Sequence, residues 1–474
     1  MHIKFLGAVE NAGEVTGSRT LLTLPDDMKV LVDFGMVHGH AGNLEETLKW
    51  NGREFEFDVD EIDYLILTHG HADHISLLPL LIKRGFKGKV ISTAPTADFC
   101  AISLPDCAKI MASDCEWANR RRPKNKLTPL YTKDEALDST LHIQCYDYNK
   151  EIVLSDNSKL ELIPAGHMLG ACMPKITYKK GRDIQSIIFT GDTSAKNSSK
   201  PFIKVAGDIG SVDYVVCEST YGNRVHNRTE DPSDILGVAA IETCLENGKT
   251  LVLPVFSLQR SSEVLWLLRE AYLKNPELHK IPIYLDTPMG IKAQSVMDNN
   301  REYWGEEWLK RDRELKSIFD WEVLQYIDDY KQSQALNNKF PKIICASSGM
   351  CTGGRILDHL KTFLPSKGCK IIFSGYQVEN GLGRKLLDKA QKSVAINRCQ
   401  TTIRADIDSI NLSSHADVNE LTEFLKTSKK GKLKKILINH GDIEAVDGLH
   451  KELKQHFKGV QIIKPRYDEN IGLK

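Results

Sequence analysis

Several short apolar runs of this chain end in a glycine and a residue that can bind a metal ion. Residues 64–67 (YLIL), 187–190 (IIFT) and 436–439 (ILIN) have the aliphatic and β-branched composition of buried strands. Residues 163–167 (IPAGH) repeat the pattern and end in Gly-His. Functional groups concentrate where rigid strands meet loops. The pattern therefore predicts strands whose ends carry a site.

The apolar pattern changes in the middle of the chain. Short strands dominate residues 1–35, and a mixed helix and strand region follows to about residue 212. Beyond it, predicted helices (231–245, 261–273 and 356–363) alternate with predicted short strands (250–256, 281–285, 342–346 and 370–374). This alternation is typical of a parallel sheet with helices on both faces. A strand at 401–405 and a helix at 418–427 are expected after it.

Residues 68–74 (THGHADH) carry the densest chemistry in the chain, with three imidazoles and a carboxylate within six positions. Side chains on an extended segment repeat every second residue, so His69 and His71 point to the same side. Asp73 and His74 follow where the chain turns toward a predicted helix (75–84) and can diverge toward a second centre. Neutral imidazoles and carboxylates suit zinc, and also manganese or iron. A polar loop that is merely rich in histidine is the alternative, but small spacers favour a metal.

Four ligands are too few for two metals, so residues further along the chain must complete such a site. His167, Asp192 and His440 each stand at the end of one of the apolar runs described above. Their order after H-x-H-x-D-H, as Gly-His, Thr-Gly-Asp and a late His-Gly, resembles the metallo-β-lactamase superfamily. The resemblance implies an α/β fold, the αββα sandwich, and a hydrolase.

The resemblance also assigns the ligands. It implies two zinc ions, with manganese possible. The first metal would be bound by His69, His71 and His167, the second by Asp73, His74 and His440, and Asp192 would bridge the two. Two cations in such a site can activate a shared hydroxide and stabilise a displacement at phosphorus. Asp33, in VLVDFG at 30–35, would orient a ligand histidine. Its other interpretation is a turn residue at the end of a strand.

The long interval between Asp192 and His440 narrows the family. Glu218 in CESTYG and His415 in LSSHAD resemble motifs A and B of the β-CASP nucleases, and His440 then serves as motif C. Further matches are LPVFS at 253–257 with Gln259 and Arg260, TPM at 287–289, SSGM at 347–350 with GGR at 353–355, and GYQ at 375–377 with GLGR at 381–384. Residues 1–212 and 399–474 would form the metallo-β-lactamase domain, and residues 213–398 the inserted β-CASP domain. The motifs are most similar to bacterial relatives of the nuclease that cuts pre-mRNA 3′ ends.

The resemblance implies a metal-dependent ribonuclease that hydrolyses single-stranded RNA by endonucleolytic cleavage, in a cleft between the domains. Asp73 and Asp33 would support the catalytic centre. His415 would donate a proton to the leaving oxygen, because the pKa of a histidine lies near the operating pH. Glu218 would hydrogen-bond His415 and favour its imidazolium form. The other interpretations are a helix-cap residue for His415 and a salt-bridge residue for Glu218.

Glycine-rich turns in the inserted domain are candidate phosphate-binding elements, because glycine lets backbone N–H groups approach an anion. The candidates are Ser257, Arg260, Ser348, Gly349, Gly353, Arg355 and Arg384. Structural turns are the alternative.

The charge balance is unusual for a protein that binds nucleic acid. The chain of 474 residues has 63 basic and 63 acidic side chains, whereas a basic excess normally supplies affinity for nucleic acid. Residues 120–126 (RRRPKNK) and 429–435 (KKGKLKK) are possible basic patches or simply solvated surface. The eleven cysteines form no C-x-x-C pair, which favours reduced thiols and a cytoplasmic location. A signal peptide and a membrane span are not expected.

Other interpretations remain open. A 5′ exonuclease or DNA nuclease acting on single-stranded DNA would use the same motifs, whereas a non-catalytic scaffold subunit would have lost ligands that this chain keeps. A small-molecule hydrolase would not need the inserted domain. His38 and His40 stand near the expected site, as substrate contacts or ordinary loop residues. Asp442 stands where the family often has Glu. Residues 460–463 are either an edge strand available for a homodimer or an ordinary sheet strand.

Overall fold

The chain folds into two units, each described here by itself. A computed structural model describes residues 1–38, 43–121, 126–195, 201–227, 229–338, 341–378, 381–428 and 432–473. Unit 1 comprises Met1–Ser199, Ile203–Val225 and Ser414–Lys474, and unit 2 comprises Lys200–Phe202 and His226–Ser413.

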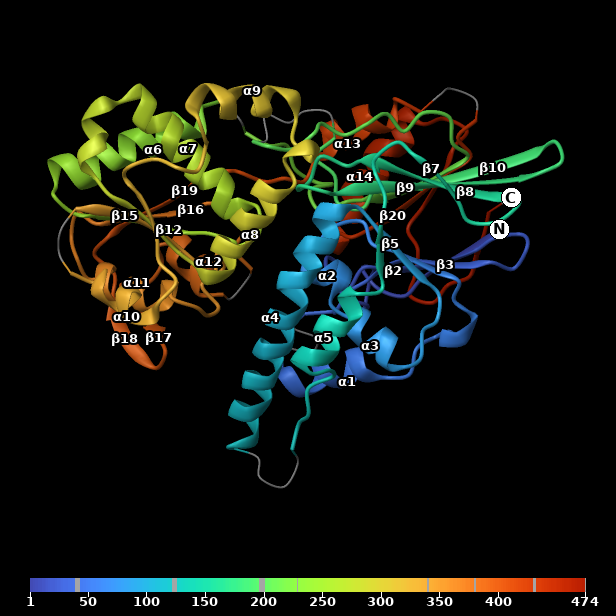
Figure 1. Cartoon of the computed structure of the whole chain (residues 1–474), viewed down its shortest axis with the longest axis horizontal. Helices are drawn as coiled ribbons and strands as arrows, with labels where there is room; N and C mark the ends of the chain where they lie inside the picture. The colour runs from blue at the N-terminus through green and yellow to red at the C-terminus, as the bar shows by residue number, and fades with distance from the viewer. Residues whose placement is uncertain are drawn as a thin grey trace. The chain divides into compact units, whose positions relative to one another are not determined.

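Within the described residues, unit 1 contains two seven-stranded sheets (Figure 1). The first has the order β22-β1-β2-β3-β4-β5-β6, and its strands are β1 (His2–Phe5), β2 (Arg19–Thr23), β3 (Lys29–Phe34), β4 (Tyr64–Ile66), β5 (Lys89–Ser92), β6 (Ile143–Cys145) and β22 (Ile471–Gly472). The second has the order β21-β20-β11-β10-β9-β8-β7, and its strands are β7 (Glu151–Val153), β8 (Ser158–Pro164), β9 (Cys172–Lys180), β10 (Asp183–Phe189), β11 (Tyr214–Glu218), β20 (Lys435–Asn439) and β21 (Gln461–Ile463).

Helices cover the outer faces of these two sheets. They are α1 (Leu44–Gly52), η2 (Val59–Glu61), α2 (Ala72–Ile75), α3 (Leu78–Lys83), α4 (Ala94–Asn119), α5 (Lys133–Thr140), α13 (Val418–Leu425) and α14 (Ile443–His456). One apolar core joins the inner faces of both sheets, for example Ile66 and Phe189, and a second lies between the first sheet and its helices, for example Leu65 and Leu104. Helix α14 packs on β20 and β21 of the second sheet. This is an αββα sandwich, which confirms the predicted fold class.

Unit 2 is built on a parallel sheet. Its described strands are β14 (Leu324–Tyr326), β13 (Ile283–Asp286), β15 (Lys342–Ala346), β12 (Thr250–Pro254), β16 (Lys370–Phe373) and β19 (Asp406–Ser409), in that spatial order, and every neighbouring pair is parallel. Its helices are α6 (Pro232–Ala240), η3 (Ile241–Glu246), α7 (Arg260–Lys274), η4 (Pro276–Lys280), α8 (Pro288–Asn299), η5 (Arg301–Tyr303), α9 (Glu306–Leu315), α10 (Tyr330–Ala335), α11 (Ile356–Phe363) and α12 (Leu382–Leu387). A separate hairpin consists of β17 (Ser393–Ile396) and β18 (Cys399–Thr402).

The main segment of unit 2 is His226–Ser413, so both of its boundaries lie later in the sequence than the predicted 213 and 398. Strand β11 pairs with β10 and β20, so the segment that carries Glu218 belongs to unit 1. Strand β19 pairs with β16, and the hairpin β17–β18 pairs with itself, so unit 2 continues to Ser413. The predicted strand at 401–405 therefore does not return to the first domain, because apolar alternation shows that a strand exists but not which sheet it joins.

Two local features also differ from, or refine, the sequence analysis. The helix expected at 75–84 is two helices, α2 and α3, and Pro79 lies in the first turn of α3, where its missing N–H needs no partner. Strand β21 forms the edge of the second sheet, next to β20.

All eleven cysteines are free thiols. Among the helices of the described ranges, none combines the length and apolar character needed to cross a membrane.

Candidate metal centre

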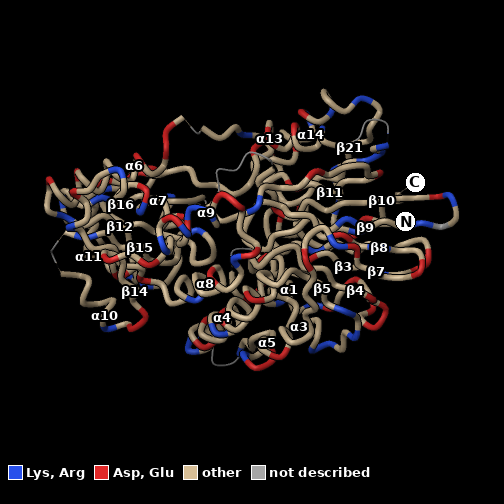
Figure 2. The backbone as a smooth tube through the Cα atoms, turned by 45° about the horizontal axis from the view of Figure 1, so that its top comes forward, with Lys and Arg blue, Asp and Glu red and all other residues tan. Residues whose placement is uncertain are grey.

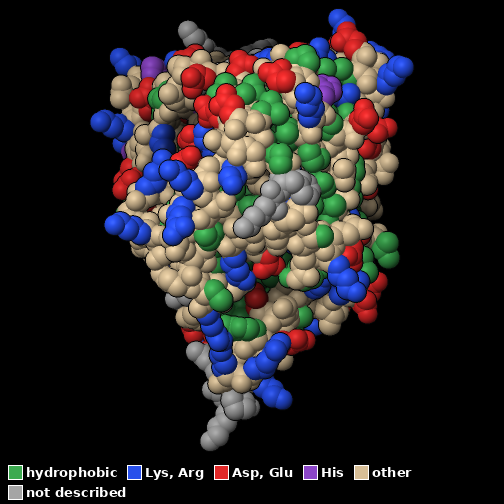
Figure 3. Space-filling view, turned by 90° about the vertical axis from the view of Figure 1, so that its left-hand side faces the viewer, with side chains coloured by type: hydrophobic (Ala, Val, Ile, Leu, Met, Phe, Trp, Pro, Cys, Tyr) green, Lys and Arg blue, Asp and Glu red, His purple; other side chains and the backbone are tan. Residues whose placement is uncertain are grey.

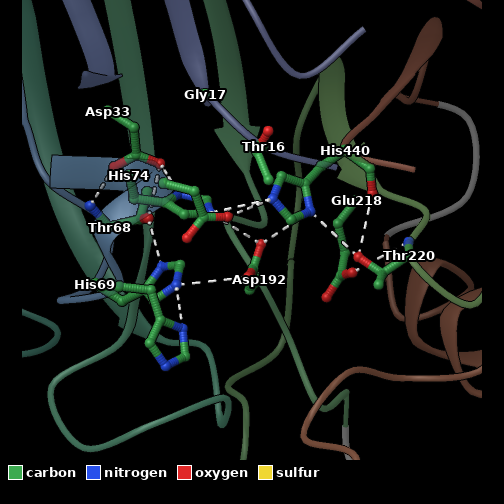
Figure 4. Close-up of polar contacts among 12 residues, drawn as sticks. Thr16, Gly17, Asp33, Thr68, His69, His74, Asp192, Glu218, Thr220 and His440 are labelled. Atoms are coloured by element: carbon green, nitrogen blue, oxygen red, sulfur yellow. Dashed lines mark hydrogen bonds and ion pairs between the residues drawn. The ribbon is translucent and has the colours of Figure 1, made fainter. Parts of the chain in front are cut away.

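The metal-binding candidates of unit 1 converge from the ends of strands in both sheets (Figure 4). His69 and His71 follow β4, and Asp73 and His74 lie in the short helix α2. The remaining candidates follow strands of the second sheet: His167 comes after β8, Asp192 after β10 and His440 after β20. Parallel pairing of β10, β11 and β20 brings the ends of three strands to one edge.

A glycine permits the close packing of this loop. A Cβ atom on Gly35, directly after β3, would lie 1.7 Å from the carbonyl oxygen of Asp73. Any side chain there would push the metal-binding loop away from the end of β3.

The first donor group consists of His69, His71, His167 and one oxygen of Asp192. The Nδ1 atom of His71 lies 3.1 Å from Nε2 of His69 and 3.2 Å from Nε2 of His167. The Oδ2 atom of Asp192 lies 3.5 Å from Nε2 of His69 and 3.6 Å from Nε2 of His167.

The second group consists of Asp73, His74 and His440. The Nε2 atoms of His74 and His440 are 3.2 Å apart, and Oδ2 of Asp73 lies 3.6 Å from the first and 3.4 Å from the second. The other oxygen of Asp192, Oδ1, lies 3.4 Å from Nε2 of His74 and 3.4 Å from Nδ1 of His440. The two oxygens of Asp192 therefore face one donor group each.

These distances fit donors arranged around metal ions. Donors about 2.0–2.1 Å from a tetrahedral zinc ion are roughly 3.3 Å apart, close to the separations within both groups. Asp192 Oδ1 is buried and makes no hydrogen bond, although a buried oxygen normally has a partner. Pairs of ring nitrogens also face each other, an arrangement in which at most one can carry the proton between them. The residues present therefore fit two cations, one in each group.

Hydrogen bonds on the far side of the rings orient these donors. His167 Nδ1 lies 3.3 Å from the carbonyl oxygen of Ser414, and His440 Nδ1 lies 3.2 Å from Oγ1 of Thr220. With Nδ1 as the donor in each contact, Nε2 keeps its lone pair for a metal. The sequence analysis assigned no role to Thr220.

Asp33 provides the same kind of support to His74. The Nδ1 atom of His74 lies 2.7 Å from Oδ2 of Asp33. Asp33 in turn accepts hydrogen bonds from the backbone N–H of Thr68 (2.7 Å) and from its hydroxyl (2.8 Å). The Thr68 hydroxyl also lies 3.0 Å from Nδ1 of His69, which leaves Nε2 of His69 facing the donor group. Asp33 and Thr68 thus connect one ligand of each group (Figure 4).

Burial and charge divide the histidines into two classes. Burial lowers the pKa of His69 and of His167 well below the ordinary value, so both rings are neutral. Burial acts the same way on His74, but the carboxylates of Asp192, Asp33 and Asp73 outweigh it and raise its pKa well above the ordinary value. Nearby positive charge is therefore needed to stabilise the buried carboxylates. Bound cations would supply that charge and displace the proton.

His415 and Glu218 form a hydrogen-bonded pair beside the donors. Nδ1 of His415 lies 2.9 Å from Oε2 of Glu218 and 3.1 Å from Oε1, and its Nε2 lies 3.8 Å from Oδ2 of Asp192. The Glu218 carboxylate is buried, whereas the His415 side chain is 20% exposed. Burial favours the neutral ring, but Glu218 and Asp192 outweigh it and raise the pKa of His415 to about 9.

Thr193 holds this pair in place, and the sequence analysis missed it. Its backbone N–H donates to Oε1 of Glu218 (2.6 Å), and its carbonyl accepts from the N–H of Ala416 (2.7 Å), next to His415. Its hydroxyl donates to the carbonyl of Ala165 (2.8 Å), two residues before His167. The signal in the sequence is a hydroxyl residue directly after a metal-binding residue at the end of a strand.

The predicted phosphate contacts belong to unit 2, and several of them contact other residues of that unit. Arg355, one of these candidates, has partners inside unit 2. Its guanidinium donates to Oδ1 of the buried Asp286 (2.6 Å) and to two backbone carbonyls, so it stabilises the core of unit 2. Arg260 likewise contacts Glu263 within its own helix. The type of residue was visible in the sequence, but the buried carboxylate that Arg355 pairs with was not.

The other candidates lie at the carboxyl ends of the unit 2 strands or on α12. The Ser257 hydroxyl lies 3.1 Å from that of Thr287. The Ser348 hydroxyl accepts from the N–H of Thr352 (3.1 Å) and of Gly353 (3.4 Å). Gly349 packs closely against Phe256, whereas the side of Gly353 where a side chain would project is open. Arg384 lies 3.5 Å from Asp388.

Some expectations fall partly outside the described residues. His40 and residues 122–125 and 429–431 are among them, so neither basic patch is described in full. The described His38 is exposed, and its N–H donates to the hydroxyl of Thr16 (3.2 Å). Basic and acidic positions are interspersed along the described backbone (Figure 2), and both signs of charge lie on the face that Figure 3 shows.

An αββα sandwich with these donors at its strand ends defines a metallo-β-lactamase-fold hydrolase. Comparison with family models agrees: residues 13–99 match the metallo-beta-lactamase superfamily, residues 261–386 the Beta-Casp domain, and residues 401–465 the Zn-dependent metallo-hydrolase RNA specificity domain.

Similar proteins span the whole chain. "Ribonuclease TTHA0252" of Thermus thermophilus is 30% identical over 97% of this chain and 98% of its own length. "Transcription termination factor FttA" of Cenarchaeum symbiosum is 27% identical over 99% of this chain and 70% of its length. "Endoribonuclease YSH1" of Mycosarcoma maydis is 27% identical over 88% of this chain, which spans 46% of that longer protein. The chain belongs to the β-CASP family of metallo-β-lactamase-fold hydrolases, and it is a metal-using enzyme.

Replacing Asp33 tests the orientation of the donors. In Asp33→Asn the charged acceptor that holds His74 is lost, so metal affinity should fall about 10–100-fold, as for other partners of ligand histidines. Competition with a chromogenic chelator measures this affinity. Asp213→Asn is the matched control, because Asp213 is also buried but bonds Ser186 instead. Wild-type affinity in Asp33→Asn would contradict the assignment.

Proposed function

We propose that this chain is a ribonuclease that hydrolyses phosphodiester bonds within single-stranded RNA, using two metal ions. The names of two of the relatives above, a ribonuclease and an endoribonuclease, support RNA as the substrate and cleavage within the strand. Zinc is the proposed metal because the donors are mostly imidazoles with carboxylates, and manganese is the alternative.

One observation carries the proposal: His415, the proposed proton donor, lies directly beside the metal-binding candidates. The ligand atoms of Glu218, Asp192 and His440 lie within 4.8 Å of one another, and the His415 ring is 4.6 Å from the His167 ring, measured between centroids. A centre that cuts phosphodiesters needs an acid for the leaving oxygen within reach of the metal-bound phosphate. His415 occupies that position.

The residues of the site have separate roles in this proposal. Bound cations would supply an activated water and stabilise negative charge on the phosphate. Asp192, with an oxygen toward each donor group, keeps the two groups in a fixed relation. His415, whose raised pKa keeps it protonated at neutral pH, presents Nε2 as the acid, while Glu218 holds Nδ1 and Thr193 holds Glu218.

We also propose that unit 2 contributes phosphate contacts. Ser348, Gly349 and Gly353 lie on the loop that follows β15, at the carboxyl end of a parallel sheet, where ligands commonly bind in such folds. Ser257 follows β12 at the same edge. Arg355 is a further candidate, and its guanidinium also donates to Asp286.

A cleavage assay tests the function. Wild-type protein with zinc or manganese should cut a 5′-labelled single-stranded RNA into internal fragments, and a chelator should abolish the cleavage. Release of mononucleotides alone from the 5′ end would refute endonucleolytic action. A parallel single-stranded DNA substrate separates the two nucleic acids. Lack of any RNA cleavage with either metal would refute the proposed function.

Removing the proposed acid should slow the reaction without unfolding the protein. We expect His415→Ala to lower the cleavage rate roughly 10²–10⁴-fold, the usual contribution of a general acid. Metal content and thermal unfolding should match the wild type. His142→Ala, at an exposed histidine of unit 1, is the control. Cleavage by His415→Ala at the wild-type rate would show that another group donates the proton.

The pH dependence tests the role of Glu218. The acid must be protonated, so the rate should fall as the pH rises through the pKa of His415. Glu218→Gln removes the largest influence that raises this pKa, so the decline should move to lower pH by about one unit or more. Glu444→Gln, at an exposed residue of unit 1, should leave the profile unchanged. An unmoved decline in Glu218→Gln would separate Glu218 from the acid.

A further inference from the structure

A strongly basic segment of unit 2 has no part in the metal centre. It comprises helix α12, the hairpin β17–β18 and their connections, residues 382–404, and is called the hairpin lobe (Figure 1). Its basic residues are Arg384, Lys385, Lys389, Lys392, Arg398 and Arg404, and its single acidic residue is Asp388. Six positive charges against one negative give a net charge of +5, in a chain whose overall net charge is zero.

These charges are exposed. Lys385, Lys389, Lys392, Arg398 and Arg404 all lie at the surface. Asp388, the one acidic residue of the lobe, lies 3.5 Å from Arg384. No ion pair joins the five exposed cations to a carboxylate of the described chain, in contrast to Lys274, Lys310 and Lys361 in other helices of unit 2. The lobe therefore presents uncompensated positive charge to the solvent.

The hairpin is firmly placed despite its exposed face. Val394 and Ile396 are buried in the core of unit 2, and Ala395 between them is exposed, as expected for a strand that is covered on one side. On the outward face, Ala395 pairs with Gln400, whose side-chain amide donates to the hydroxyl of Ser393 (2.6 Å). Polar groups are thus held in defined positions.

A pocket of about 300 Å³ opens in the lobe. Leu382 and Val394 give it apolar walls, and Gln391, Ser393 and Gln400 supply amide and hydroxyl groups. Lys385 adds a positive charge at the same pocket. This volume lies at the lower end of the range for sites that enclose small organic groups.

We propose that the hairpin lobe binds a nucleotide of single-stranded RNA through residues of unit 2 that are not part of the metal centre. A base has two apolar faces and an edge of donors and acceptors, which match the apolar walls and the amide groups of Gln391 and Gln400. The neighbouring phosphates match the exposed cations of Lys385, Lys389 and Lys392. An acidic protein segment would match the charge but would leave the amides without defined partners. This inference rests on the proposed function, because it takes the substrate to be RNA.

A charge-reversal variant tests the lobe directly. The probe is a fluorescein-labelled 12-nucleotide single-stranded RNA, and fluorescence anisotropy measures its affinity in the presence of chelator, so that no cleavage occurs. Lys385→Glu/Lys389→Glu/Lys392→Glu should bind at least 10-fold more weakly near 100 mM salt. The slope of log K against log salt should decrease by about 2, since each single-strand phosphate contact contributes roughly 0.7.

The matched control changes the same amount of charge in unit 1. Lys451→Glu/Lys454→Glu/Lys458→Glu reverses three exposed lysines and should change RNA affinity less than twofold. Circular dichroism and thermal unfolding verify that both variants remain folded. Equal losses in the two variants, or no loss in the lobe variant, would overturn the proposal.

A pocket variant separates base recognition from charge. Gln391→Ala keeps every charge, so it should weaken RNA binding while the salt slope stays unchanged, and the loss should differ between oligo(A) and oligo(U). Wild-type affinity of Gln391→Ala for both oligonucleotides would overturn the base-binding part.

Cleavage by the wild type distinguishes this inference from the proposed function. If the wild type cuts RNA but the lobe variant binds RNA as well as the wild type does, only the lobe proposal fails. If the wild type binds RNA through the lobe yet never cuts it with metal, the proposed function fails and the lobe proposal stands.

Discussion

The site depends on the contacts that the buried carboxylate of Asp192 makes with the surrounding histidines. Its two oxygens face two separate groups of imidazole and carboxylate donors, at distances of 3.4–3.6 Å. A buried carboxylate is costly unless positive charge compensates it. Near Asp192, His74 and His415 have raised pKa values and can carry positive charge, and the cations that the donor groups would bind supply more. The αββα sandwich is therefore the scaffold that makes such a concentration of donors possible.

The supporting contacts explain why the donors keep their orientation. Asp33 and Thr68 connect the two histidine groups behind the rings, and Thr193 links the loop after Asp192 to both Glu218 and the neighbour of His415. These contacts use backbone groups at strand ends, whose positions the parallel pairing of β10, β11 and β20 determines. The metal-binding candidates and His415, the proposed proton donor, thus share one rigid framework, which favours preorganised chemistry.

The sequence predicted the fold class and brought the right side chains to attention, because apolar strands that end in metal-binding residues leave a clear local pattern. It could not predict which sheet a strand joins, so the strand expected at 401–405 was assigned to the wrong unit. It also could not show partners distant in sequence. The sequence suggests Arg355 as a phosphate contact, but it does not show that its guanidinium pairs with Asp286, far away in the chain. The contacts of Thr193 with Glu218 and Ala416 could not be predicted because they use backbone groups that every residue has.

The number of metal ions per chain is the most direct test of this account. Protein stripped with a chelator and then titrated with zinc should bind two ions per chain by native mass spectrometry, and Asp192→Asn, which keeps the shape of the side chain, should weaken both. Binding of a single ion by the wild type, or loss of only one ion in Asp192→Asn with the other unaffected, would contradict the view that Asp192 joins two cation sites into one centre.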